Sequence, residues 1–207
     1  MKLRSMKPER SDSYPLRRRD VVARLLSERG DLLVVSGLGA PTWDVTAAGD
    51  GPGNFPLWGA MGGAAMVGLG LALAQPERRV LVITGDGEML MGLGSFATVA
   101  AKQPENLALV VLDNERYGET GMRATHPAGK VDLTAVAAAC GFPIAETVTD
   151  EAGLAAALPL IAGANDGPVF VTVKVRAENL PLDMPPKDGA YLKDRFRVAL
   201  LGVDNAV

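Results

Sequence analysis

The sequence predicts an α/β protein of three layers, in which a mostly parallel β-sheet is covered by helices on both faces. Short, continuously apolar segments alternate along the chain with segments that read as helices. Apolar strands of this kind are typical of a buried parallel sheet. The chain has 207 residues, of which 48 % are hydrophobic. That is enough for the core of one domain, or of one and a half.

Strands are expected where apolar residues run without a break, at 32–37, 79–85, 107–114 and 168–175, with a weaker one at 143–148. Helices are expected between them, at 20–29, 40–49, 61–74, 92–102, 133–140 and 151–161. The stretch 49–56 is dense in Gly and Pro and predicts a loop. Each glycine within 61–74 costs a helix roughly 1 kcal/mol relative to alanine. Several of them together suggest that a neighbouring element packs very close.

The sheet and its helices are expected to form one domain over residues 16–176. Residues 1–15 are polar and basic and predict a mobile, solvated segment, whereas 177–207 predict an arm with a short helix. The one cysteine, Cys140, excludes an internal disulfide and favours a reducing, cytoplasmic compartment. Because it follows a run of alanines, we expect Cys140 to be a small buried core residue.

Charge and composition exclude several classes of function. The net charge of −3 gives no field that would attract nucleic acid or an acidic membrane. His126 is the only histidine, which excludes metal sites built on paired histidines. The longest apolar run, 60–74, has 15 residues, and a membrane span needs about 20.

The stretch "TGDGEML" at 84–90 follows a strand and opens a helix, where ligands of parallel sheets bind. Gly85 and Gly87 let the backbone approach a ligand, and the N–H groups of Gly87 and Glu88 suit a phosphate. Asp86 would repel a diphosphate unless a cation lay between them. Mg²⁺ meets this need, because it takes oxygen ligands at about 2.0–2.1 Å from protein and phosphates together.

The end of the next strand offers further oxygen ligands for such a cation. Asn114 lies 28 positions after Asp86, one strand–helix–strand step along the chain. Its amide oxygen is a neutral ligand, and the turn behind it offers a backbone carbonyl, most plausibly that of Arg116. Tyr117 and Gly118 then let the chain pass beside the phosphates. Both strand ends should lie at the same edge of the sheet.

These residues together resemble the thiamine diphosphate motif of the decarboxylase and acetohydroxyacid synthase superfamily. The resemblance covers roughly 32–175, and "WGAMGGAAMVGLGLALA" at 58–74 resembles the G-S-M-G segment of those enzymes. It implies that Met61 props the cofactor into its bent form and that the Gly59 carbonyl contacts the 4′-amino group. Gly37, at the first strand end, is expected beside the cofactor, and Glu88 is expected to be structural or adjacent to a phosphate.

Full-length members of this superfamily also have a pyrimidine-binding domain, which contributes the glutamate that activates the cofactor. The chain is too short to hold both domains, so the resemblance implies a partner subunit that supplies this glutamate, in an assembly of at least two chains. The segments 36–45 and 119–142 resemble the sulfopyruvate and phosphonopyruvate decarboxylases. Met122–Ala124 stand in place of the Gly-Gln-Pro of that branch, which leaves the substrate open.

The resemblance implies a non-oxidative 2-oxo acid decarboxylase that uses thiamine diphosphate and Mg²⁺ and acts on a 3-substituted pyruvate. C2 of the cofactor would add to the ketone, CO₂ would leave, and an aldehyde would be released. His126 is the candidate acid/base or anion-binding group, and an exposed surface histidine is the alternative. Arg123 would pair with a sulfonate, phosphonate or carboxylate, or would simply be exposed, and Glu119 would be structural or lie near a phosphate.

Other interpretations remain open at this point. A carboligase of the acetohydroxyacid synthase kind would use the same cofactor, although the absence of a cysteine cluster argues against an iron–sulfur version. A non-catalytic protein could keep only the cofactor half. The Gly-rich stretches at 37–42 and 68–74 lack the third glycine or the preceding strand of a nicotinamide site. Gly85–Gly87 could be a plain turn, and Met61 an ordinary core residue.

Overall fold

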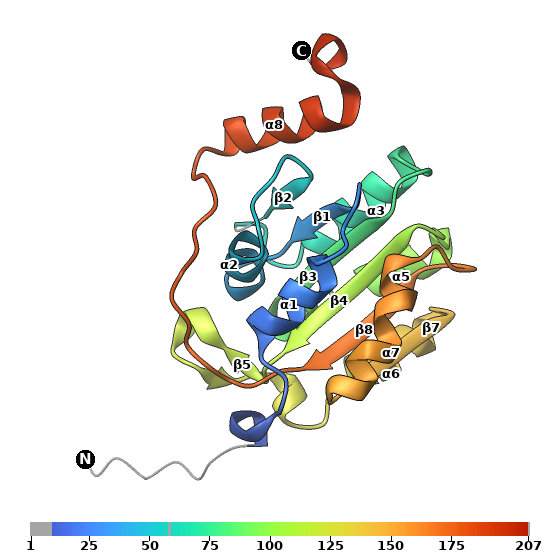
Figure 1. The fold of residues 1–207 in the computed structure, drawn as a ribbon. Coiled ribbons are helices and arrows are strands. Elements are labelled where there is room, and N and C mark those ends of the chain that lie inside the picture. The colour runs from blue at the N-terminus through green and yellow to red at the C-terminus, as the bar shows by residue number, and fades with distance from the viewer. Residues whose placement is uncertain (1–9, 58, 207) are drawn as a thin grey trace.

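The computed structural model describes residues 10–57 and 59–206 and shows one six-stranded sheet with helices on both faces (Figure 1). The strand order is β2-β1-β3-β4-β8-β7, and every neighbouring pair is parallel. The strands are β1 Leu33–Ser36, β2 Asn54–Pro56, β3 Val80–Gly85, β4 Leu107–Asp113, β7 Ile144–Val148 and β8 Val169–Lys174. The predicted three-layer α/β architecture is confirmed.

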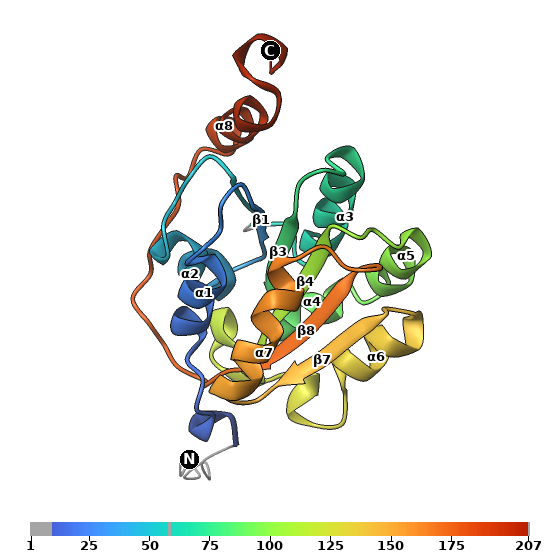
Figure 2. The same ribbon diagram turned by 45° about the vertical axis from the view of Figure 1, so that its right-hand side comes forward.

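The helices other than α8 lie in two layers on either side of the sheet, and α8 lies apart from them next to β2, as Figures 1 and 2 show. The helices are α1 Arg18–Leu26, α2 Ala40–Ala47, α3 Ala64–Ala74, α4 Asp86–Met91, α5 Ser95–Lys102, α6 Leu133–Cys140, α7 Glu151–Ala162 and α8 Gly189–Leu201. A two-stranded antiparallel hairpin, β5 Arg116–Tyr117 and β6 Arg123–Ala124, follows β4. Single 3₁₀ turns are η1 Arg10–Ser13, η2 Gly118–Thr120, η3 His126–Ala128 and η4 Val203–Asn205.

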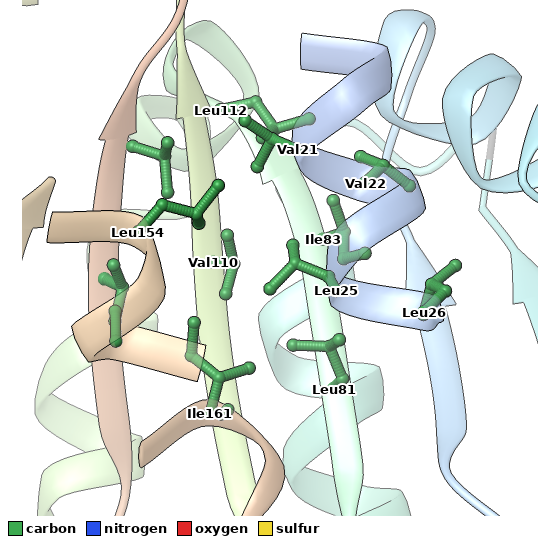
Figure 3. Packing of buried hydrophobic residues seen from close by; sticks show 14 of the residues in the cluster. Val21, Val22, Leu25, Leu26, Leu81, Ile83, Val110, Leu112, Leu154 and Ile161 are labelled. Atoms are coloured by element: carbon green, nitrogen blue, oxygen red, sulfur yellow. The ribbon is translucent and has the colours of Figure 1, made fainter. Parts of the chain in front are cut away.

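The core has two halves, one on each face of the sheet, because successive strand residues point to opposite faces. On β3, Leu81 and Ile83 belong to the half under α1 and α7, whereas Val80 and Val82 belong to the half under α3, α5 and α6. Figure 3 shows the first half, where side chains of α1 and α7 meet those of β3 and β4. This two-sided burial explains why the central strands β3 and β4 are apolar at most positions.

Two helices begin later than the sequence predicts, and glycines account for the difference. The helix expected over 61–74 begins at Ala64, because Gly62 has φ +86° and cannot be part of it. The helix expected over 92–102 begins at Ser95, and a separate helix, α4, ends before it at Met91. A Cβ on Gly92 would lie 2.2 Å from the Gly62 carbonyl oxygen. The two turns therefore pack backbone against backbone.

Two further expectations are wrong. The stretch 49–56, expected to be a loop, contains the edge strand β2, which pairs with β1. Pro56 is compatible with this position, because an edge strand leaves one row of backbone groups unpaired. Cys140 is exposed rather than buried, since the whole last turn of α6, residues 138–140, faces solvent and its buried face ends at Ala137.

The two chain ends run along the domain. In the described part of the expected N-terminal segment, Ser11 is fully buried and its carbonyl accepts a hydrogen bond from the Ala177 N–H at 2.9 Å. Residues 177–188 form the predicted arm, without regular structure, and lead to α8. This helix packs on β2, with the rings of Phe196 and Phe55 5.0 Å apart between centroids. Across the described residues, the helices are too short or too polar to span a bilayer.

One glycine of α3 explains the close packing that the sequence suggests. A Cβ on Gly68 would lie 2.2 Å from a methyl carbon of Val82, which is fully buried on β3. Gly70, on the exposed side of the same helix, has nothing within 4 Å of the place that a Cβ would take. The spacing between α3 and the sheet is therefore set at Gly68.

We expect Gly68→Ala to lower the free energy of unfolding by about 1–3 kcal/mol, because the added methyl group overpacks the α3–β3 contact. The matched change Gly70→Ala should raise it by up to about 1 kcal/mol through helix propensity alone. Urea denaturation of both variants measures the difference. Equal stability of the two variants would contradict the close approach at Gly68.

Candidate active site

Three neighbouring strands end at one edge of the sheet and bring the predicted residues together. β1, β3 and β4 are adjacent, and Gly85 at the end of β3 pairs with Leu112 near the end of β4. The loops that follow line a cavity of about 150 Å³. Its lining includes these residues of the predicted site: Met61, Gly85, Asp86, Gly87, Glu88, Asn114, Arg116, Tyr117 and Gly118.

Three predicted residues do not line this cavity. Gly37 lies behind it, where a Cβ would fall 1.8 Å from a carboxylate oxygen of Glu88. Gly59 is exposed, and nothing lies within 4 Å of the place a Cβ would take. His126 is exposed next to the cavity, with its Nδ1 3.4 Å from the hydroxyl of Tyr117.

Asp86 is the buried carboxylate of the site. It is the first residue of α4 and only 2 % exposed, and one of its oxygens accepts a short hydrogen bond from the Thr125 hydroxyl. Burial, with the nearby charge of Asp113, raises the pKa of Asp86 to about 8. A carboxylate kept from water in this way is stabilised in its charged form by a bound cation.

Asn114 and the hairpin after it supply the other oxygen atoms at this edge that could bind a metal. The Asn114 side-chain oxygen accepts a hydrogen bond from the backbone N–H of Arg116 at 2.9 Å, which fixes the turn between them. Opposite this turn, a Cβ on Gly87 would lie 2.5 Å from a ring carbon of Tyr117. Any larger residue there would force the Tyr117 ring to move, so glycine lets α4 and the hairpin approach closely.

The oxygen ligands present suit a divalent cation that is bound together with a diphosphate. One carboxylate, one amide oxygen and a backbone carbonyl are hard oxygen ligands, the kind that Mg²⁺ takes when phosphates supply the rest. Among the described residues, no three His, Cys, Asp or Glu side chains gather as a metal site.

Glu88 joins three segments of backbone behind the cavity. Its carboxylate accepts hydrogen bonds from the Leu38 N–H at 2.7 Å, the Thr84 hydroxyl at 2.6 Å and the Gly62 N–H at 3.3 Å. Burial raises the pKa of Glu88, although these donors favour the charged form. These contacts fit the structural role expected for Glu88, which also lines the cavity.

Several residues at the site were not predicted from the sequence. Thr125 holds Asp86, and Glu115 lies buried between Asn114 and Arg116. Arg18 lines the cavity from α1, and its charge is matched by a buried ion pair with Asp44. The 39 positions between Thr125 and Asp86 contain no pattern that signals the contact. It exists because the β5–β6 hairpin folds back over α4.

The mouth of the cavity is apolar and open. Met61 and Met91 both line it, and their side chains are 59 % and 60 % exposed. Contiguous exposed apolar patches can mark surfaces on which another protein packs. These two exposed methionines, the Met61–Met91 rim, border the cavity.

Comparison with known proteins identifies the family. Residues 48–173 match the model described as "Thiamine pyrophosphate enzyme, C-terminal TPP binding domain". The chain belongs to the thiamine pyrophosphate enzymes. The resemblance seen in the sequence is confirmed, and the family is one that uses this cofactor.

Two curated relatives are about 40 % identical to this chain over the aligned residues. The sulfopyruvate decarboxylase subunit beta of Methanothermobacter thermautotrophicus is 40 % identical over 181 residues, which span 87 % of this chain and 94 % of that subunit. The phosphonopyruvate decarboxylase of Streptomyces viridochromogenes is 42 % identical over 197 residues, 94 % of this chain. The match covers only 49 % of that enzyme, so the chain spans about half its length.

Solved structures share the fold. Benzoylformate decarboxylase from Polynucleobacter necessarius superposes with a TM-score of 0.66 over 86 % of this chain and 36 % of its own length, at 20 % sequence identity. At this identity the similarity establishes the thiamine diphosphate-binding fold and nothing finer.

Glu88 provides a test of how the back of the site is held together. We expect Glu88→Ala to lower the free energy of unfolding by about 2–3 kcal/mol, because it leaves the Leu38 N–H and the Thr84 hydroxyl buried without an acceptor. Glu88→Gln should cost less, since its amide oxygen still accepts. Denaturant unfolding compares the two, and equal losses would contradict a role through these hydrogen bonds.

Proposed function

We propose that this chain is the thiamine diphosphate- and Mg²⁺-binding subunit of a non-oxidative 2-oxo acid decarboxylase, acting on a 3-substituted pyruvate. The observation that carries the proposal is the pairing of Asp86 with Asn114. They lie at the ends of adjacent strands, on one cavity, in a member of the thiamine pyrophosphate enzymes.

The proposed metal ligands are Asp86, Asn114 and the backbone carbonyl of Arg116. Gly85 and Gly87, with Tyr117 and Gly118 opposite, would border the diphosphate, whose charge the cation offsets. Met61, at the mouth of the cavity, is the proposed support for the bent cofactor. The Gly59 carbonyl and Gly37 remain predicted contacts, and both lie outside the cavity lining.

Thiamine diphosphate, when bound, supplies the nucleophilic carbon for the 2-oxo group and the electron sink for decarboxylation. The chain's part is to bind, orient and keep water out. Asp86 and Asn114 would hold the diphosphate through the cation, and the exposed Met61 and Met91 would give the mouth of the cavity an apolar border. We propose that His126, exposed beside Tyr117, gives or takes a proton during the reaction.

The curated relatives indicate the class of substrate. By name, one decarboxylates sulfopyruvate and the other phosphonopyruvate, and each of these compounds carries a second anionic group beside its carboxylate. Arg123 and His126 are exposed on the β5–β6 hairpin and the turn after it. We propose that they bind the second anion. Both quoted relatives are decarboxylases, which favours decarboxylation over the carboligase alternative.

A partner subunit would complete the site. One relative is named as a beta subunit, and the other is a single chain about twice as long as the matched region. We propose that a pyrimidine-binding subunit packs on the Met61–Met91 rim and contributes the activating glutamate. The expected cytoplasmic location stays a prediction that rests on the single cysteine.

The first experiment is calorimetric titration of the purified chain with thiamine diphosphate, with and without Mg²⁺, and then with its candidate partner subunit. We expect binding that requires Mg²⁺ and tightens when the partner is added, because the partner closes the other side of the cofactor. Asp86→Ala and Asn114→Ala should each abolish the Mg²⁺-dependent binding, since each removes a ligand.

The matched control is Asp166→Ala, which removes an exposed carboxylate before β8, at the other edge of the sheet. It should bind like the parent chain. Unchanged binding in Asp86→Ala would refute the site assignment. Binding by the parent without any activity in the presence of the partner would favour a non-catalytic cofactor-binding protein.

Substrate recognition is tested in the assembled enzyme with sulfopyruvate, phosphonopyruvate and pyruvate. We expect Arg123→Gln to raise KM for the two doubly anionic substrates by roughly 10- to 100-fold, the value of a charge-assisted hydrogen bond. His126→Gln should lower kcat by about 100-fold or more if it transfers a proton. Lys130→Gln, a nearby exposed cation, is the control. Parent-like kinetics in both variants would show that the hairpin is not part of the substrate site.

A further inference from the structure

The turn before α1 lies against the turn 114–116, which contains two of the proposed metal ligands. We call residues 10–14 the N-terminal strap; Figure 1 shows this turn at the same end of the molecule as β5. Tyr14 donates its hydroxyl hydrogen to one carboxylate oxygen of Glu115 at 2.7 Å, and the Arg10 Nε donates to the same oxygen at 2.8 Å. Lys174, at the end of β8, lies 3.4 Å from it. The strap and the sheet thus hold one side chain from two sides.

Glu115 is the residue between Asn114 and the Arg116 carbonyl. It is 2 % exposed and has φ +59°, a left-handed conformation that a non-glycine residue keeps only when its surroundings impose it. Its backbone N–H donates to Asp113 at 3.0 Å, and its carbonyl accepts from the N–H of Thr125 at 3.0 Å. The conformation of Glu115 therefore sets the directions in which both neighbours point.

Glu115 is also linked to Asp86, the third proposed metal ligand. Thr125, whose N–H is bound by the Glu115 carbonyl, donates its hydroxyl hydrogen to Asp86. Arg10 adds a second contact on this side, from its Nη2 to the Pro127 carbonyl at 3.0 Å. All of the proposed protein ligands of Mg²⁺ are within a few hydrogen bonds of the strap.

The strap is itself fixed to the domain. The Tyr14 carbonyl accepts from the Arg176 Nε at 3.0 Å, and the Ser11 carbonyl accepts from the Ala177 N–H. Leu16, just after the strap, is 1 % exposed in the core. A segment anchored at both ends can transmit a fixed geometry to Glu115.

We propose that the N-terminal strap, acting through Glu115, is a positioning element that holds the 114–116 turn in its metal-binding conformation. The inference rests on the proposed function, because it needs Asn114 and Arg116 to be metal ligands. A purely structural strap would stabilise the fold without any effect on the metal. Side chains that orient metal ligands, in contrast, change the affinity for the metal itself.

The test uses Tyr14→Phe and Arg10→Gln in the full chain, each with a matched control. Tyr191→Phe removes an exposed hydroxyl on α8, and Arg17→Gln breaks an ion pair with Glu178 on the arm. Thiamine diphosphate is titrated at a series of Mg²⁺ concentrations, and amide hydrogen exchange of residues 113–126 is followed without cofactor. We expect the strap variants to need roughly tenfold more Mg²⁺ for half-saturation and to exchange faster in that segment. The controls should match the parent chain in both measurements.

A double variant tests the route of the effect. Because Tyr14 acts through the Glu115 side chain, Tyr14→Phe combined with Glu115→Ala, which removes the accepting carboxylate, should need no more Mg²⁺ than Glu115→Ala alone. Additive effects of the two changes would overturn the route through Glu115.

The outcomes separate this inference from the proposed function. If Asp86→Ala abolishes binding while the strap variants keep the parent's Mg²⁺ dependence, the inference fails and the site assignment stands, whatever happens to hydrogen exchange. If Asp86→Ala binds like the parent, the proposed function fails and the inference fails with it. A tenfold shift in the strap variants alone, at unchanged thermal stability, supports positioning.

Discussion

The site depends on one constraint, the parallel pairing of β1, β3 and β4 as neighbours. Parallel strands end at the same edge of a sheet, so Gly37, Asp86 and Asn114 lie together although 77 positions separate the first from the last. The two-sided core fixes this arrangement, because a slip of one residue would turn every strand side chain to the wrong face. The position of the buried Asp86 carboxylate follows from the register of β3 against β4.

Strands and the central motif could be read from the sequence because their signals are local. β3, β4 and β8 are predominantly apolar segments, and the Gly-Asp-Gly turn lies directly at the end of β3. What could not be predicted depends on contacts distant in the chain. The late start of α3 follows from the packing of Gly62 against Gly92, and β2 is a strand only because β1 offers it an edge.

The same division applies to the site. Asp86 and Asn114 are recognisable by residue type and spacing, whereas Thr125 and Glu115 act through folded-back segments whose partners lie far along the chain. Gly59 shows the opposite case. A role implied by resemblance falls on an exposed residue that does not line the cavity.

Two buried glutamates lie close to Asp86 in the sequence or the fold, and their surroundings differ in charge. The Glu88 carboxylate accepts from neutral donors, and burial raises its pKa. At Glu115, burial opposes the charged form, but Arg10, Tyr14 and Lys174 outweigh it and lower the pKa.

On the α1 side, the charge of Arg18 is matched by Asp44. The chain thus places cations around Glu115 and Asp44, while burial and the charge of Asp113 raise the pKa of Asp86. A divalent cation bound with a diphosphate would reverse that effect, which is why the folded chain and its proposed cofactor suit each other electrostatically.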